Sequence, residues 1–131
     1  MNQDASAAPP LDDRGLPEGY DFDEQLEITP RQVHDMRAGG EPFVLIDCRT
    51  PQEHGIVHIE QAELIPLQTA AAQMEKLSAW QDGSIVVHCH HGGRSLQMTQ
   101  LLRQAGFADV KSMTGGIDLW AIDIEPGMQR Y

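Results

Sequence analysis

The chain has few of the residues that mark secreted, membrane-spanning or nucleic-acid-binding proteins. Its 131 residues include two cysteines, too few for a disulfide framework, so both are expected to remain thiols in a reducing compartment. No apolar run reaches the about 18 residues that a membrane span needs, and no basic, apolar leader opens the chain. These absences and the length predict a single-domain cytoplasmic protein without a membrane partner.

Basic side chains are also scarce. Nine arginines and lysines stand against 20 acidic residues, which gives a net charge of -11, and Lys76 and Lys111 are the only lysines. A surface with this balance repels the phosphates of nucleic acids and anionic lipids. Neither is therefore expected as a partner.

The amino end of the chain differs in composition from the rest. Residues 1–25 hold seven acidic residues and one basic residue, and the first part is rich in alanine, proline and glycine without apolar periodicity. Such a segment cannot bury enough apolar surface to fold by itself. We therefore predict an acidic, mobile arm over residues 1–22 and one folded domain over residues 23–131.

The remainder alternates short apolar runs with segments of helical spacing. Strands are predicted near residues 25–28, 43–47, 64–66, 84–88 and 110–113. Helices are predicted over residues 30–38, 69–80 and 95–105, with short helical turns after Pro51 and around residues 117–121. This alternation favours an α/β fold of three layers, with a mainly parallel central sheet and helices on both faces. Ligands of such folds bind beyond the carboxyl ends of the strands.

The segment over residues 84–95 carries the clearest chemical signal. An apolar run ends at Cys89, a turn with two glycines comes next, and helical spacing begins at Ser95, which we predict to be the N-cap. Cys89 would then face the positive end of a helix and a concavity of backbone N–H groups. Together with the guanidinium of Arg94, these groups favour a thiolate and an anionic substrate.

On the residues alone, Cys89 is the candidate nucleophile and Arg94 the candidate group that orients an oxyanion. A free cysteine is more often a small buried hydrophobic residue, but a polar, glycine-containing turn is a poor place for one. This chemistry by itself is compatible with phosphate, arsenate or sulfur substrates.

Four motifs occur in an order that resembles the single-domain rhodaneses, a family of sulfurtransferases. They are Leu45–Arg49 followed by Pro51–His54, then His58–Ala62, then Cys89–Ser95, and finally Gly115–Trp120. The resemblance extends over about residues 25–125 and implies a rhodanese-like fold. It also implies that a loop of six residues from cysteine to arginine belongs to the sulfurtransferase branch, whereas the related phosphatases have one residue more.

The resemblance implies an activity. Cys89 would take the outer, sulfane sulfur of a small anionic donor, thiosulfate or a persulfide, and pass it from a Cys89 persulfide to a thiophilic acceptor, with a protein as a further candidate donor or acceptor. No cofactor and no metal are implied. Besides Cys89, the substrate-binding residues would be His90, His91, Gly92, Gly93, Arg94 and Ser95.

Two other functions stay open on the sequence. A cysteine-dependent phosphatase or arsenate reductase would use the same thiolate, although the short loop argues against it. A non-catalytic interaction module would leave the thiol without a role, and the intact loop makes this the weaker hypothesis.

The residues at the end of the second predicted strand are interpreted as structural rather than chemical. Asp47 and Arg49 are expected to support the site as an ion pair that anchors the surrounding loops. Cys48, between them, is interpreted as a small buried residue. The sharper hypothesis makes Cys48 a resolving thiol that attacks the Cys89 persulfide or closes a disulfide, because both cysteines end neighbouring strands.

Histidines surround the cysteine. His90 and His91 stand where rhodaneses often have a basic residue, so we expect weaker thiosulfate binding that improves below about pH 6.5 as imidazole gains its proton. With His88 and Cys89 they also suggest a zinc site. Adjacent strand residues point to opposite faces, so this alternative is disfavoured and no metal is expected.

Overall fold

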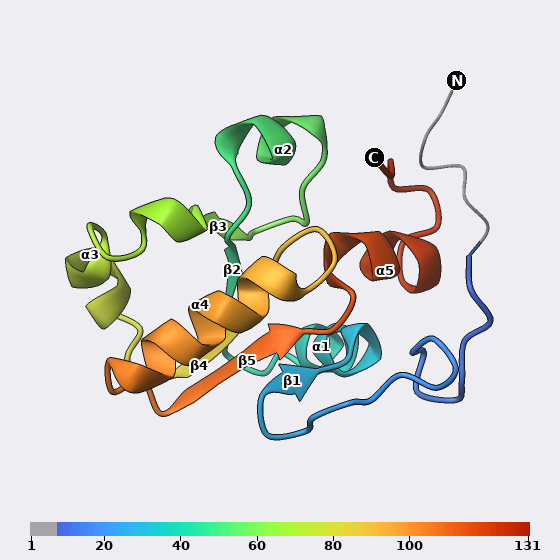
Figure 1. Ribbon diagram of the computed structural model, residues 1–131, viewed down its shortest axis with the longest axis horizontal. Helices are drawn as coiled ribbons and strands as arrows, with labels where there is room; N and C mark the ends of the chain where they lie inside the picture. The colour runs from blue at the N-terminus through green and yellow to red at the C-terminus, as the bar shows by residue number, and fades with distance from the viewer. Residues whose placement is uncertain (1–7) are drawn as a thin grey trace.

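The computed structural model describes residues 8–131 and shows an α/β fold (Figure 1). Five strands form one sheet in the order β1-β5-β4-β2-β3, and every neighbouring pair is parallel. The strands are β1 (Glu27–Ile28), β2 (Val44–Asp47), β3 (Glu63–Leu64), β4 (Ser84–His88) and β5 (Asp109–Met113). The predicted parallel sheet is confirmed.

Helices cover both faces of the sheet. They are α1 (Pro30–Ala38), α2 (Pro51–Ile56), the 3-10 turn η1 (Leu67–Thr69), α3 (Met74–Ser78), α4 (Gly93–Gln104) and α5 (Gly116–Asp123). α4 crosses the sheet on one face and α1 lies on the other, while α2 stands beyond the end of β2 (Figure 1). Among the described residues, no helix is long and apolar enough to cross a bilayer.

The two central strands alternate their side chains between two apolar cores. Ile46 of β2 and Val87 of β4 belong to the core on the face of α3 and α4, whereas Leu45 and Val86 belong to the core shared with α1 and α5. This period of two is the geometry of a strand covered on both faces. It accounts for the continuous apolar runs in the sequence.

Local capping explains where the first two helices begin. Thr29 and Thr50 each accept a hydrogen bond from the backbone three residues later, and Gln32 and Glu53 each accept one from the cap backbone in return. A proline occupies the first helical position in both, where its missing N–H costs nothing.

Two helix predictions were wrong in their limits. The helix predicted over residues 69–80 is instead η1 followed by the short α3, because the Thr69 hydroxyl bonds the Pro66 carbonyl and holds the Gln73 amide, closing a local turn. The helix predicted over residues 95–105 instead starts at Gly93 and ends at Gln104, with Gly92 as its N-cap at φ 116°. Ser95 is therefore inside the first turn, not at the cap.

The segment before residue 23 differs from the expectation because part of it packs against the folded domain. Residues 1–7 lie outside the described residues, but Leu16 is fully buried and Arg31 donates to the Asp13 carbonyl. Tyr20 donates to the buried Glu27 of β1 at 2.5 Å. The exclusion of residues 8–22 from the core is thus corrected, while the boundary at residue 22 stays a prediction.

Candidate active site

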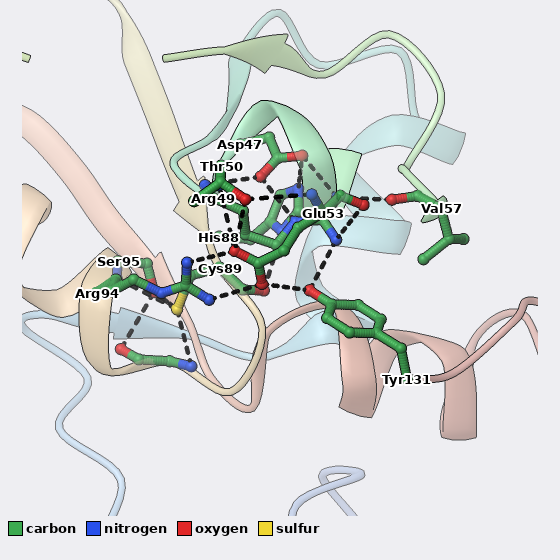
Figure 2. Close-up of polar contacts among 11 residues, drawn as sticks. Asp47, Arg49, Thr50, Glu53, Val57, His88, Cys89, Arg94, Ser95 and Tyr131 are labelled. Carbon is green, nitrogen blue, oxygen red and sulfur yellow. Dashed lines mark hydrogen bonds and ion pairs between the residues drawn. The ribbon is translucent and has the colours of Figure 1, made fainter. Parts of the chain in front are cut away.

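The candidate site lies beyond the carboxyl ends of β2 and β4 (Figure 2). Asp47 and His88 are paired in register as the last residues of these strands, and the Cys48 N–H donates to the His88 carbonyl at 3.0 Å. Cys48 and Cys89 are therefore the first residues beyond the two strand ends. Each is 1% exposed.

Several donors surround the Cys89 sulfur. The backbone N–H groups of Gly92 and Ser95 donate to Sγ at 3.1 and 3.4 Å, and the Ser95 hydroxyl lies 3.5 Å from it. The Ser95 hydroxyl is in turn 2.7 Å from the hydroxyl of Ser112 on β5. The N-terminal turn of α4 thus directs backbone and hydroxyl donors to the Cys89 sulfur.

The two thiols differ in acidity. Hydrogen bonding with the Cys48 thiol lowers the pKa of Cys89 most, burial opposes the shift, and the Ser95 and Gly92 donors add to it. The same hydrogen bond, burial and the Cys89 charge raise the pKa of Cys48. Cys89 is therefore the thiolate and Cys48 the thiol.

The cysteine loop, residues 89–94, is closed from the side by α5. The N–H groups of Ile117 and Asp118 donate to the carbonyls of Cys89 and His90 at 2.9 and 3.1 Å. A Cβ atom at Gly116, which has φ +60°, would lie 2.5 Å from the same two carbonyl oxygens. Only glycine fits this contact without displacing the loop.

Four amides of the cysteine loop point to no acceptor within residues 8–131. They belong to His90, His91, Gly93 and Arg94, whereas the Gly92 amide is used by the sulfur. Successive N–H groups in such a turn attract an anion. The loop can therefore hold an anionic atom beside the Cys89 sulfur.

The Arg94 side chain is bound to a residue that the sequence did not single out. Its guanidinium makes a bidentate ion pair with Glu53 of α2 at 2.6 and 2.9 Å, which directs its donors to that carboxylate. Arg94 lowers the pKa of Glu53, and Tyr131 also donates to this carboxylate at 2.7 Å. The sequence predicted a short helical turn after Pro51, and that local pattern could not indicate this ion pair.

Asp47 and Arg49 form a fully buried ion pair. The guanidinium donates to the carboxylate at 2.7 and 2.9 Å, to the Val57 carbonyl at 2.7 Å and to the Tyr131 hydroxyl at 2.9 Å. Burial acts to raise the pKa of Asp47, but the hydrogen bonds and charge of Arg49 together with the nearby His88 outweigh it and the pKa is lowered. The pair ties the end of β2 to the segment after α2.

The histidines lie at the rim. His90 stacks on Tyr131 with ring centroids 3.9 Å apart, and His91 is largely exposed with Nδ1 3.9 Å from Asp118. Burial and the neighbouring His91 lower the pKa of His90. Within residues 8–131, no group of three or more potential ligands is placed to hold a metal ion.

Ser112 and Tyr131 were missed by the sequence reasoning, as Glu53 was. Ser112 is one small residue in a strand of mixed polar and apolar residues, and Tyr131 comes to the site from 82 positions beyond Arg49. Neither belongs to a local pattern. Their roles arise from contacts between distant segments.

Comparison with known proteins places the chain among proteins of one family. The family model described as "Rhodanese-like domain" matches residues 29–123. The thiosulfate sulfurtransferase GlpE of Pseudomonas aeruginosa is 36% identical over 93 residues, which cover 71% of this chain and 81% of that protein. The probable adenylyltransferase/sulfurtransferase MoeZ of Mycobacterium tuberculosis is 40% identical over 106 residues, 79% of this chain.

The chain spans about a quarter of the length of MoeZ, 26%. Solved structures agree with the fold. The human single-domain sulfurtransferase TSTD1 has a TM-score of 0.65 at 25% identity and covers 74% of this chain and 96% of its own. A rhodanese-related protein from Thermoplasma volcanium has a TM-score of 0.68 at 24% identity, over 77% of this chain and 95% of its own.

Proposed function

The chain belongs to the rhodanese-like domain family, and we propose that it is a sulfurtransferase in which Cys89 carries sulfane sulfur as a persulfide. One observation carries the proposal most: the Cys89 sulfur accepts two backbone hydrogen bonds inside a loop whose other amides have no acceptor within the described residues. This arrangement favours a thiolate before the reaction and an additional anionic sulfur after it.

The reaction has two displacement steps. The Cys89 thiolate attacks the outer sulfur of the donor, forming an S–S bond while the donor's own bond to that sulfur breaks and its electron pair leaves with a thiolate or sulfite. A thiophilic acceptor then attacks the outer sulfur of the persulfide and regenerates the thiolate. No net electron is gained or lost by the protein over the cycle.

The predicted site residues have distinct roles in this proposal. The amides of His90, His91, Gly93 and Arg94 hold the outer sulfur, those of Gly92 and Ser95 hold the Cys89 sulfur itself, and Gly92 and Gly93 allow the turn. Arg94 acts through Glu53, fixing the loop against α2. Asp47 and Arg49 keep the neighbouring strand end in place.

We further propose that the donor is a persulfide rather than the thiosulfate dianion. The guanidinium groups near the cysteine loop are neutralised: Arg94 by Glu53 and Arg49 by Asp47, while Asp118 binds Arg130 at 2.9 Å. His90 is kept neutral by its lowered pKa. The thiosulfate dianion therefore meets backbone dipoles, but the guanidinium groups that could balance its two charges are already neutralised. A persulfide carries less negative charge and depends less on such cations. A thiol, of a small molecule or of a cytoplasmic protein, is the proposed acceptor.

Mass spectrometry tests the transfer itself. The wild-type protein and Cys89→Ser are incubated with thiosulfate or with cysteine persulfide, and the site of any added sulfur atom is mapped. We expect one extra sulfur on Cys89 in the wild type and none in the variant. Hydrolysis of p-nitrophenyl phosphate without any sulfur adduct would instead support the phosphatase alternative.

Glu53→Gln tests the donor preference. Glutamine keeps the capping-box geometry but frees the charge of Arg94, so we expect the KM for thiosulfate to fall about 3- to 10-fold, with a smaller change for cysteine persulfide. Glu60→Gln removes the same charge at an exposed position and serves as the control. A wild-type kcat/KM for thiosulfate that equals or exceeds the value for cysteine persulfide would contradict the preference.

A further inference from the structure

The second cysteine lies on the same face of the sheet as the first. Ile46 pairs in register with Val87, and both side chains enter the core on the face of α3 and α4. Because side chains alternate along a strand, the residues two positions on return to that face. Cys48 and Cys89 are those residues, and both belong to the same core cluster.

The spacing of the two cysteines suits a disulfide. The strands are neighbours, and the hydrogen bond from the Cys48 N–H to the His88 carbonyl at 3.0 Å continues their pairing past the last residues in register. Neighbouring strands lie about 4.8 Å apart, inside the range of about 4.4–6.8 Å that Cα atoms of a disulfide span. Both cysteines are free thiols in this structure.

The surroundings of Cys89 provide different places for its own sulfur and for a transferred sulfur atom. Sγ of Cys89 lies in the core beside Cys48, 1% exposed, whereas the amides without acceptors among the described residues lie farther along the cysteine loop. In a persulfide, the inner sulfur would remain next to Cys48 and the outer sulfur would extend toward those amides. Cys48 therefore faces the inner sulfur.

We propose that Cys48 is a resolving cysteine, which attacks the inner sulfur of a Cys89 persulfide and releases hydrogen sulfide. This inference rests on the proposed function, because it needs the persulfide to form. Cys48 is in this sense a second catalytic residue, and the chain gains a second outcome for its sulfur: release as sulfide when no acceptor arrives.

The step balances without an outside oxidant. The Cys48 sulfur forms a bond to the Cys89 sulfur while the bond between the inner and outer sulfur breaks, and the electron pair leaves with the outer sulfur. The proton of the Cys48 thiol passes to the outer sulfur before the attack, so a thiolate displaces hydrosulfide from a neutral persulfide, and the products are a Cys48–Cys89 disulfide and the hydrosulfide ion. The two cysteine sulfurs are oxidised and the sulfane sulfur is reduced. A dithiol reductant then restores both thiols for another cycle.

A single-turnover experiment without acceptor tests the proposal. The protein is loaded with cysteine persulfide under anaerobic conditions, freed of donor by gel filtration, and followed for sulfide release and intact mass. We expect the wild type to lose the extra sulfur atom and two hydrogens, with one sulfide released per chain, at least about tenfold faster than Cys48→Ser. Peptide mapping should find a disulfide between residues 48 and 89.

Cys48→Ser is the matched variant because it keeps the size and a hydrogen-bond donor but cannot form the disulfide. Cys48→Ala provides a second comparison, and near-ultraviolet circular dichroism checks that each variant is folded. A wild-type persulfide as persistent as that of Cys48→Ser would overturn the proposal, as would sulfane sulfur found on Cys48 without sulfide release. If no persulfide forms on Cys89 even in Cys48→Ser, where it cannot be resolved, the proposed function fails instead.

Discussion

Cys48 and Cys89 occupy matching positions at the ends of β2 and β4, yet the pKa values of their thiols are shifted in opposite directions. Both are the first residue after a strand, both face the same core and both are 1% exposed. Nevertheless the pKa of Cys89 is lowered and that of Cys48 is raised. Equal burial cannot account for the difference.

The two strand ends differ in the course of the chain after the cysteine. After Cys48, Arg49 turns inward and is bound to Asp47, so that its donors point away from the sulfur. After Cys89, the chain bends at Gly92 and returns two N–H groups to the sulfur at the start of α4. The two cysteines share one hydrogen bond, so the donors that only Cys89 has, the Ser95 hydroxyl and the Ser95 and Gly92 amides, rather than a nearby cation, decide which member of the pair ionises.

Removing the buried cation at the end of β2 should have the largest effect. Arg49→Met leaves the Asp47 carboxylate buried without its ion pair, so we expect a loss of about 3–5 kcal/mol in the free energy of unfolding, measured by denaturant titration. Asp47→Leu combined with Arg49→Met removes both charges and should recover much of this loss. An Arg49→Met protein as stable as the wild type would show that the pair does not hold this strand end.

The acidity difference can be measured directly. Lowering the pH protonates a thiolate only as it passes the pKa, so the lowered pKa of Cys89 predicts thiolate absorbance that persists at about pH 6, far below the ordinary thiol value of about 8.5. The absorbance should be absent in Cys89→Ser and present in Cys48→Ser. An ordinary midpoint, or absorbance that survives in Cys89→Ser, would reverse the assignment.

Disturbing the contact between α5 and the cysteine loop should have a smaller effect on stability. At Gly116, alanine would meet the Cys89 and His90 carbonyls in a left-handed backbone conformation, and we expect it to lower stability by about 1–3 kcal/mol and to raise the Cys89 pKa by disturbing the loop. Gly127→Ala meets no atom within 4 Å and is the control. Equal effects of the two substitutions would mean that α5 does not hold the loop.

The smallest expected change concerns the Ser112 hydroxyl, which bonds the Ser95 hydroxyl behind the Cys89 sulfur. Ser112→Ala removes the hydroxyl that bonds Ser95, a contribution of about 1 kcal/mol, so the pKa of Cys89 should rise by less than about one unit. Ser84→Ala, another serine on a strand, serves as the control and should leave the thiolate titration unchanged. A larger rise than that of Gly116→Ala would mean that the Ser112 hydroxyl matters more than the loop backbone.

Much of the fold arises from local patterns. The strand runs, the capping prolines and the turn after Cys89 predicted the parallel sheet and the place of the cysteine. The helix predicted over residues 69–80 was wrong because side-chain hydrogen bonds at Thr69 favoured a turn. Leu16 was excluded from the core because a single buried residue in a polar segment has no periodic signal.

The site was predictable in its loop but not in its partners. Residues 89–95 are contiguous, so their spacing alone indicated a thiol in a nest of amides. The partner of Arg94 lies 41 positions away and the serine behind Ser95 lies 17 positions away. Nothing in the local sequence encodes such distances.

The sequence by itself determined that a cysteine would end a buried strand and meet a helix N-terminus, because strand length, glycines and helical spacing are local properties. Only the tertiary structure decided that Arg94 would be neutralised by Glu53 and that Cys48 would lie beside the reactive sulfur. Both depend on which strands become neighbours and in what register, and register results from packing the whole sheet.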